Sequence, residues 1–464
     1  MQRRKFIQYT AASGAALMLN PFQTFADSKN KKTKLALVGT GHRGSGFWGQ
    51  TLLKNYGKHI EFTGLCDINP GRLAYVKKIL DVKCPAFINY DEMLNTVQAD
   101  YIIVTTTDST HDQFIIKALD AGFNVITEKP MTNDELKCSD ILTAEKRSGK
   151  KLIVAFNYRH SVHNMQVKEL LNTNRIGQVT SVDFNWYLNV HHGADYFRRW
   201  HGLRKYSNSL FVHKSTHHFD LLNWWLNSEP VEVSAYGALE HYGKNNSFRG
   251  STCRDCEYKT TCRYYWDITK DQRLTNLYVL NEQYDGYHRD GCVFRNEIDI
   301  YDKMSAQIIY ANGVVANYSL TTYSPYEGWQ IAFNGKNGRL ETWEDIPYLQ
   351  KLPEDQSKKH AVEMTQSDDA VQGEVREIMV MDNFADKYEV FTTPKISGGH
   401  GGGDVRMQKR IFVDTNDNPH NVMAGTRDGA MSLLIGVAAR KSIEQKRPVK
   451  IAELTNLIPK AERF

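Results

Sequence analysis

The sequence predicts an α/β protein with two domains, a doubly wound parallel sheet followed by a domain with a large, mainly antiparallel sheet. Three observations predict this fold. Short apolar runs alternate with helix-length segments up to about residue 156, and later segments show the two-residue alternation of half-buried strands. The chain has 464 residues, which is too long for one ordinary core, and 41% of them are hydrophobic, which provides enough apolar residues for two cores. We therefore expect domains at residues 31–156 and 157–464.

The first domain is expected to alternate strands and helices along a parallel sheet. Each expected strand is a short apolar run, as is typical of strands that are covered on both faces. The expected strands are residues 34–38, 61–66, 101–105, 124–127 and 151–155. The expected helices run from the first strand to about residue 56 and then span 70–80, 113–121 and 134–148.

The second domain is expected to contain an antiparallel sheet and a long C-terminal helix. Alternating apolar and polar residues predict strands, and apolar residues at helical spacing predict the helix at 425–445. The polar segment 346–393 is expected to be rich in loops. The expected strands are residues 179–190, 231–239, 304–310 and 314–321.

Residues 1–30 are expected to be an export signal with a linker. Arg3 and Arg4 precede a weakly apolar stretch at 9–19, and residues 24–26 suit cleavage. This pattern resembles a twin-arginine signal and predicts a periplasmic protein; the alternative is a chance basic N-terminus on a cytoplasmic protein. A membrane-spanning helix needs about 20 apolar residues, so we expect no stable membrane insertion after signal removal.

A glycine-rich turn directly after the first strand predicts a dinucleotide site. The turn reads Gly39-Thr40-Gly41-His42-Arg43-Gly44 and precedes a helix, whose N-terminus favours an anion such as a diphosphate. Asp67, at the end of the second strand, is placed to accept hydrogen bonds from a ribose and to repel a 2'-phosphate, which favours NAD over NADP. The alternative is that the glycines only form a tight turn.

Three further motifs resemble the Gfo/Idh/MocA family of oxidoreductases. They are Thr127-Glu128-Lys129-Pro130, Phe156-Asn157-Tyr158-Arg159 and His217-His218-Phe219-Asp220-Leu221. The resemblance implies a Rossmann domain and a larger α/β domain whose open sheet often forms the interface of a homo-oligomer. It also implies that the lysine of the first motif lies beside the nicotinamide and the substrate, and that the helix histidine, here His217, completes the site.

The resemblance and the turn together give two sets of candidate residues. The residues expected at the cofactor are Gly39, Thr40, Gly41, His42, Arg43, Gly44, Asp67, Thr106, His111, Glu128, Lys129 and Asn157. The residues expected at the substrate are Lys129, Tyr158, Arg159, His192, Arg198, Trp200, His217 and His218, with Asp195, Tyr196, Arg199 and His400 as further candidates.

The catalytic base stays open between two residues, because the chain departs from the family pattern at one position. An aspartate generally stands four residues before the helix histidine, and His213 occupies that place. A neutral imidazole can accept a hydroxyl proton. Lys129 is the other candidate, since the pKa of a lysine falls beside a cationic oxidised nicotinamide. His217 is expected to contact the reacting hydroxyl. For His213 and His218, the alternative to a role in the site is a purely structural one.

Four of the seven cysteines form a separate group within an expected insertion at 247–296. They are Cys253, Cys256, Cys262 and Cys292. Four thiolates at such spacing suit a structural zinc ion or an iron–sulfur cluster, and two disulfides are the equal alternative in an exported protein. In either case their expected role is to staple the insertion.

The sequence thus predicts an NAD(P)-dependent oxidoreductase that acts on a secondary hydroxyl or ketone of a sugar, glycoside or polyol. A net charge of +5 without clustering excludes a nucleic-acid footprint. The alternative is a redox-neutral glycosidase that resembles the family 109 glycoside hydrolases, which share a Gly-His-Gly-Gly pattern like that at 399–402. A non-catalytic sensor is expected to lose Lys129 and His217, and both are present.

Overall fold

The computed structural model describes residues 31–350, 355–358 and 369–464. The predicted export signal at 1–30 lies outside the described residues. Among the helices that are described, none combines the length and the apolar character needed to cross a membrane.

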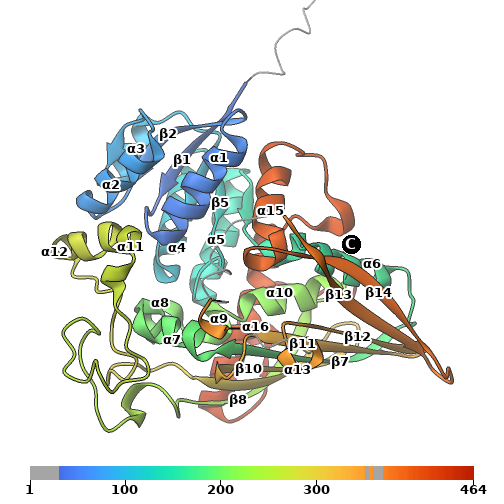
Figure 1. The fold of residues 1–464 in the computed structure, drawn as a ribbon. Helices are drawn as coiled ribbons and strands as arrows, with labels where there is room; N and C mark the ends of the chain where they lie inside the picture. The colour runs from blue at the N-terminus through green and yellow to red at the C-terminus, as the bar shows by residue number, and fades with distance from the viewer. Residues whose placement is uncertain (1–30, 351–354, 359–368) are drawn as a thin grey trace, which may run out of the picture. The chain divides into compact units, whose positions relative to one another are not determined.

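The N-terminal domain is built on a parallel sheet of six strands within the described residues, in the order β3-β2-β1-β4-β5-β6 (Figure 1). Alternate residues of β1 enter two different hydrophobic clusters, Leu35 and Leu37 on one face and Ala36 and Val38 on the other, so both faces of the sheet are buried. This confirms the predicted doubly wound sheet. The strands are β1 (Thr33–Val38), β2 (Ile60–Cys66), β3 (Ala86–Phe87), β4 (Tyr101–Val104), β5 (Asn124–Thr127) and β6 (Leu152–Val154).

The helices between these strands begin and end at residues that suit helix termini. At the start of α2, the Asn69 side chain accepts a hydrogen bond from the backbone N–H of Arg72 and Pro70 follows it; at the end of α5, Gly149 has a left-handed conformation. The helices are η1 (Gly44–Thr51), α1 (Leu52–Tyr56), α2 (Pro70–Leu80), α3 (Tyr90–Thr96), η2 (Asp108–Thr110), α4 (His111–Asp120) and α5 (Glu135–Ser148).

The C-terminal domain contains a sheet of nine strands within the described residues, in the order β14-β13-β12-β11-β7-β10-β9-β8-β15. All neighbours are antiparallel except β7 and β10, which run parallel. The mainly antiparallel prediction is confirmed. The strands are β7 (Val179–Asn189), β8 (Pro230–Ala238), β9 (Lys303–Tyr310), β10 (Val315–Ser324), β11 (Gly328–Gly335), β12 (Gly338–Glu344), β13 (Ala370–Asp382), β14 (Tyr388–Ile396) and β15 (Val449–Lys450).

The expectation that residues 346–393 are rich in loops is wrong for β13 and most of β14. These two strands pair at the edge of the sheet, and in β13 only Ile378 and Val380 are buried. An edge hairpin that buries so few side chains has little of the apolar alternation by which strands are predicted.

The C-terminal domain also contains many helices, most of them short. They are η3 (Asn157–His160), α6 (Val162–Asn172), α7 (Val190–Arg198), η4 (Trp200–Gly202), α8 (Arg204–Ser207), α9 (Leu210–His213), α10 (Thr216–Trp225), η5 (Gly243–Asn245), η6 (Ile268–Lys270), α11 (Gln272–Leu277), η7 (Val279–Asn281), α12 (Glu282–Asp285), α13 (Pro347–Gln350), η8 (Gly399–Gly402), α15 (Gly403–Phe412), η9 (Pro419–Asn421), α16 (Thr426–Gln445) and η10 (Ile451–Glu453).

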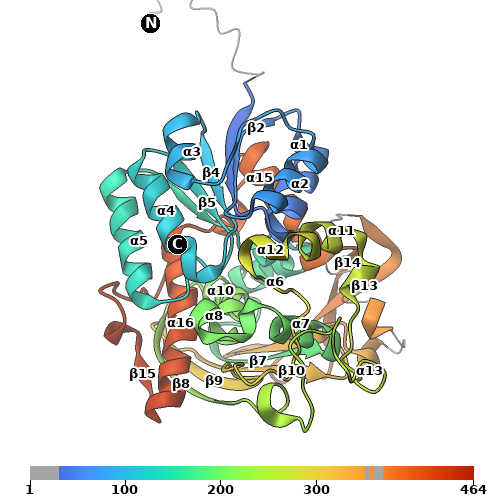
Figure 2. The ribbon, with the colours of Figure 1, turned by 90° about the vertical axis from the view of Figure 1, so that its left-hand side faces the viewer.

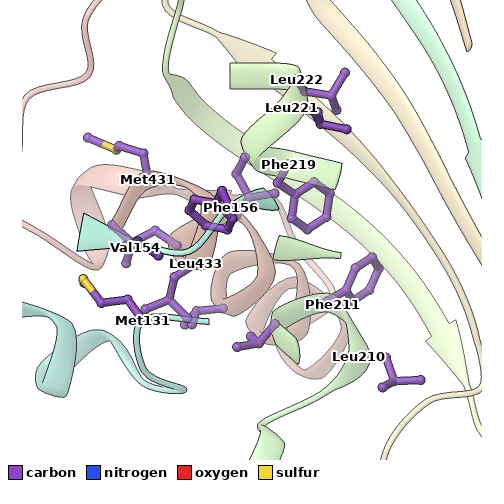
Figure 3. Packing of buried hydrophobic residues seen from close by; sticks show 14 of the residues in the cluster. Met131, Val154, Phe156, Leu210, Phe211, Phe219, Leu221, Leu222, Met431 and Leu433 are labelled. Atoms are coloured by element: carbon purple, nitrogen blue, oxygen red, sulfur yellow. The ribbon is translucent and has the colours of Figure 1, made fainter. Parts of the chain in front are cut away.

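The helix α16 joins the two domains. Figure 3 shows Met431 and Leu433 of this helix beside Met131, Val154 and Phe156, which come from the end of the N-terminal domain. The approach is close, because a Cβ atom at Gly429 would lie 2.9 Å from Val154 Cγ2 and 3.1 Å from Met131 Sδ. We conclude that the two domains share one hydrophobic core along α16.

The segment between β8 and β9 also reaches the N-terminal domain. Its helices α11 and α12 lie beside α2 (Figures 1 and 2). Leu274, Leu277 and Tyr278 are buried in the hydrophobic cluster that contains Leu35 and Leu37 of β1. The cysteine-bearing insertion is therefore part of the N-terminal core as well as of the C-terminal domain.

A buried ion-pair cluster fixes the start of the C-terminal domain. Arg159 in η3 is fully buried; its Nε and Nη2 lie 2.7 and 2.6 Å from the carboxylate oxygens of Asp220 in α10, and Nη2 lies 2.7 Å from Asp428 in α16. Two nitrogens of the guanidinium are thus bonded to carboxylates, Nη1 has no hydrogen-bond partner among the described residues, and substrate binding by Arg159 stays a prediction.

We expect Asp220→Ala to lower the free energy of unfolding by about 3–5 kcal/mol, because it leaves the buried Arg159 with one carboxylate. The exposed ion pair of Asp120 and Arg147 provides a control, because Asp120→Ala should lower the free energy of unfolding by no more than about 1 kcal/mol. Thermal denaturation monitored by circular dichroism compares the two variants. Equal shifts in Tm would show that the cluster does not stabilise the fold.

Candidate active site

The glycine turn lies at the carboxyl end of β1 and has no room for a side chain at Gly39 or Gly44. Gly39 has a φ of +90°, and a Cβ atom at Gly44 would lie 2.1 Å from the Gly39 carbonyl oxygen. Asp67, at the end of β2, accepts hydrogen bonds from the backbone N–H and the hydroxyl of Thr40 at 2.7 and 2.9 Å. A bare backbone turn, the helix after it and a carboxylate fixed beside it fit the diphosphate and ribose of a dinucleotide.

An ion-pair network joins this turn to two distant segments. Arg43 Nε donates to Glu128 at 2.6 Å, and its Nη2 donates to Asp404 at 2.8 Å. Asp404 also accepts from Asn157 at 2.6 Å and lies 3.0 Å from His400 Nδ1. Burial alone would raise the pKa of Asp404, but the charge of Arg43 and the contact with His400 hold it far below its usual range.

This network contains three residues that were expected to contact the cofactor. The side chains of Arg43 and Glu128 and the Nδ2 of Asn157 are bonded within it, and their contact with the cofactor stays a prediction. Their placement orients the neighbouring Lys129 and the loop that carries His400.

Lys129 lies beside a buried histidine–aspartate pair that the sequence did not reveal. Its Nζ donates to the His213 carbonyl oxygen at 3.1 Å, and His213 Nδ1 lies 2.6 Å from a carboxylate oxygen of Asp108. Asp108 follows β4 at the carboxyl edge of the parallel sheet, where ligands bind in such folds. That position was the signal that could have identified it.

Burial sets the protonation of this group. Desolvation lowers the pKa of Lys129 to about 8, although the charges of Asp108 and Glu128 oppose the shift. Desolvation and the charge of Lys129 lower the pKa of His213 well below its usual value, so the imidazole is neutral. Burial raises the pKa of Asp108, against the charge of Lys129.

His217 is the second group that faces this region. Its buried Nδ1 has no hydrogen-bond partner among the described residues. Its ring lies 4.9 Å from that of Tyr158 and 5.6 Å from that of His400, measured between centroids. Burial and then the charge of Lys129 lower the pKa of His217. A buried, unpartnered ring nitrogen beside an amine is suited to bind a substrate hydroxyl.

Two other predicted histidines have partners elsewhere. His218 stacks on Trp186 with centroids 3.8 Å apart, and its Nδ1 lies 2.6 Å from the Tyr318 hydroxyl. Its buried Nε2 has no hydrogen-bond partner among the described residues, and its contact with substrate stays a prediction. The ring nitrogens of His111 lie 2.9 and 3.1 Å from the carbonyl oxygens of Pro130 and Thr106. His111 thus holds the loop after Lys129 rather than pointing to a cofactor.

An aromatic group next to His213 contains the predicted Trp200. Trp200 stacks on His201 with centroids 3.6 Å apart, and His201 lies 4.1 Å from His213. His201 was not among the residues predicted for the site, although it adjoins Trp200 in the same aromatic segment. His192 lies further along, with Nδ1 3.0 Å from Glu327.

A cavity of about 360 Å³ lies next to His217 and is lined in part by Tyr158 and His400. Both of these side chains contact His217. Its size falls in the range of small-molecule sites. The other lining residues used below are the aromatic Trp186 and Trp329 and the charged Glu327, Glu344 and Arg376.

The four insertion cysteines lie together, but their expected chemistry lacks support. Cys253, Cys256, Cys262 and Cys292 line one small cavity with Arg198. All are free thiols, and the described part of the chain holds no group of three or more His, Cys, Asp or Glu side chains that could bind a metal ion. Arg198 Nη1 donates to Cys253 Sγ at 3.0 Å. The guanidinium of Arg198 therefore lies at the cysteine group, and substrate binding by Arg198 stays a prediction.

Two family profiles match the chain. The profile described as the NAD-binding Rossmann fold of the Gfo/Idh/MocA oxidoreductase family covers residues 33–156. The profile described as the C-terminal alpha/beta domain of the same family covers residues 168–451. The N-terminal domain is thus an NAD-binding domain by family.

Individual proteins agree with this match. The chain is 35% identical over 444 residues to the Bacillus subtilis protein YteT, whose name describes an oxidoreductase, with 90% of this chain and 98% of that protein aligned. It is 24% identical over 208 residues to inositol 2-dehydrogenase/D-chiro-inositol 3-dehydrogenase of Lactiplantibacillus plantarum, which covers 44% of this chain and 55% of that protein.

Solved structures share the fold. The WlbA dehydrogenase of Bordetella pertussis, in complex with NADH and UDP-GlcNAcA, aligns with a TM-score of 0.60 at 16% identity over 90% of this chain and 99% of that one. The aldose-aldose oxidoreductase of Caulobacter crescentus, complexed with glycerol, aligns with a TM-score of 0.58 at 16% identity over 90% and 100%.

We expect Asp67→Ala to weaken NAD binding roughly 10- to 100-fold, because hydrogen bonds to a charged group contribute about 1.5–3 kcal/mol. The variant should also lose its preference for NAD over NADP. Isothermal titration calorimetry measures both affinities. Asp100→Ala, at the opposite end of the strands, is the matched control and should bind NAD as the unsubstituted protein does. An unchanged affinity in Asp67→Ala would place the ribose contact elsewhere.

Proposed function

Because the chain belongs to the Gfo/Idh/MocA family of oxidoreductases, we propose that it transfers hydride between NAD and a secondary hydroxyl or ketone of a sugar, glycoside or polyol. The observation that carries this proposal is the half-buried Lys129, whose Nζ lies 3.1 Å from the His213 carbonyl oxygen and whose pKa is lowered to about 8 by desolvation. It lies against His213, and its charge acts on His217.

The side chains of this chain provide the proton transfer. NAD, when bound, accepts or returns the hydride. The neutral amine of Lys129 accepts the hydroxyl proton at Nζ, and its bond to the His213 carbonyl holds it in place. We assign His213 as a positioning residue rather than the base, because Asp108 occupies its Nδ1 and its pKa is strongly lowered. His217 binds the hydroxyl through its ring.

The cavity supports a sugar as the substrate class. It presents aromatic rings and paired charged groups, among them Arg376 Nη1 2.6 Å from Glu344. Rings pack against the apolar faces of a sugar, while charged groups that are already neutralised offer hydrogen bonds to its hydroxyls without requiring a charged ligand. Tyr158 and His400 connect this cavity to His217.

A glycosidase that uses NAD without net redox change is the second candidate. The observation that favours it is the loop at 399–402, which carries the Gly-His-Gly-Gly pattern and brings the ring of His400 to 4.7 Å from the ring of Tyr158, measured between centroids.

We also propose that the protein is exported, because Arg3 and Arg4 fit the twin-arginine pattern. An exported enzyme has little soluble dinucleotide to exchange, which favours a cofactor that is reoxidised in place.

The deciding experiment incubates the purified mature protein with a panel of sugars, polyols and aryl glycosides. Absorbance of NADH and release of the aglycone are followed together. Accumulation of NADH in proportion to substrate supports the oxidoreductase. Cleavage that depends on bound NAD, without net NADH, supports the glycosidase.

We expect Lys129→Met to lower kcat by at least about 10²- to 10⁴-fold, the usual contribution of a general base. The methionine retains the unbranched side chain up to Cε and removes only the amine, so NAD binding should be retained. Lys137→Met is the control, because Lys137 pairs with Asp112 outside the site. Stopped-flow hydride transfer and NADH fluorescence measure the two properties. Full activity in Lys129→Met would remove the proposed base.

The pH dependence of kcat/KM should report the ionisation of the Lys129 amine. A lowered lysine pKa means that the neutral base forms above about pH 8, so kcat/KM for hydroxyl oxidation should rise with pH and level off above that value. The charge of Asp108 raises the pKa of Lys129, so Asp108→Asn should move the rising limb to lower pH. Asp112→Asn should leave it in place. A limb that does not move in Asp108→Asn contradicts this coupling.

A further inference from the structure

The insertion between β8 and β9 lies directly on the glycine turn. The Tyr278 hydroxyl accepts a hydrogen bond from the backbone N–H of His42 at 2.8 Å. Arg273 bonds to the His42 ring at 3.0 Å, to its carbonyl oxygen at 3.3 Å and to the Ser45 hydroxyl at 3.1 Å. The turn that suits a diphosphate is thus covered by side chains from outside the Rossmann domain.

The same insertion covers the end of β2, where Asp67 stands. Asn69 Nδ2 donates to the Asn281 carbonyl oxygen at 2.9 Å, and Arg72 forms an ion pair with Asp285. A Cβ atom at Gly71 would lie 2.1 Å from Asn281 Oδ1, so the two segments are in tight contact. The insertion therefore spans both parts of the domain that face a dinucleotide, the turn and the ribose carboxylate.

Positive charge exceeds negative charge where the insertion meets the turn. The charges of Arg289, Arg273 and Arg199 all act on His42 and, after burial, lower its pKa. The Asp195 carboxylate lies 2.6 Å from Arg199 and 3.7 Å from Arg289, while the bonds of Arg273 run to neutral groups. Three guanidinium groups around one carboxylate favour a bound anion.

Two of these arginines also keep unused donors. The Nε atoms of Arg273 and Arg289 are buried and have no hydrogen-bond partner among the described residues. Only 5% of Arg289 is exposed. A buried guanidinium donor without an acceptor is unfavourable unless a ligand supplies one.

We propose that the insertion is the outer half of the cofactor site, where Arg273 and Arg289 bind the diphosphate of NAD and the segment must move before NAD can leave. Two negative charges of a diphosphate balance the surplus at the turn. The proposal rests on NAD binding and not on the identity of the substrate. It assigns binding residues to a segment that lies outside the region matched by the NAD-binding profile.

The test compares NAD binding by Arg273→Met, Arg289→Met and the unsubstituted full-length protein. We expect each variant to bind NADH roughly 10- to 100-fold more weakly by fluorescence titration. Each should lose NAD on gel filtration, where the unsubstituted protein retains about one NAD per chain. Arg263→Met, an exposed arginine on the same insertion, is the matched control and should retain NAD.

Equal affinity and equal release rates in the folded variants overturn the proposal while leaving NAD binding intact. Failure of the unsubstituted protein to bind NAD overturns the proposed function as well, so the two failures are distinguishable. Should a variant not fold, amide hydrogen exchange of residues 268–289 in the unsubstituted protein decides. Slower exchange with NAD supports the proposal, and unchanged exchange contradicts it.

Discussion

The guanidinium of Arg43 is the interaction on which the rest of the site depends. It bonds Glu128 and Asp404 and lies 3.8 Å from the ring of Phe47, so it joins the glycine turn, the end of β5 and the start of α15. Both carboxylates are buried, and removing their common partner would leave two uncompensated negative charges. Because Glu128 precedes Lys129 and Asp404 holds His400, the amine and the cavity wall take their positions from this one group.

Desolvation then determines the chemistry. The same burial that lowers the pKa of Lys129 to about 8 also keeps His213 and His217 neutral, so the imidazoles act as hydrogen-bond partners beside an amine that can lose its proton near neutral pH. The aspartate that the family resemblance led us to expect at position 213 is absent. A carboxylate comes instead from Asp108 at the edge of the parallel sheet. It does not replace the aspartate directly but contacts Nδ1 of the His213 ring.

The strands of the parallel sheet other than β3, the central strands β7 to β10 and the glycine turn were predictable because their signals are local: apolar runs, two-residue alternation and glycines. The pairing of Asp108 with His213 was not, since its members lie 105 positions apart, and the place of Asp108 after β4 indicates only that it lies near the site. The partners of Arg159 and Arg198 could not be predicted for a related reason. A motif shows where a guanidinium begins, but only the fold shows whether it turns toward a cavity, a buried carboxylate or a thiol.

The proposed export and the proposed closure of the insertion make the same physical demand. A cofactor that leaves freely is diluted outside the cytoplasm, whereas one enclosed by a segment from the second domain leaves only when that segment opens. Opening requires breaking the contacts of Arg273 and Tyr278 with the turn and exposing Leu274 and Leu277, which belong to the N-terminal core. Because the insertion shares that core, release of the dinucleotide is coupled to partial unpacking of the domain that binds it, and retention follows from the stability of the fold itself.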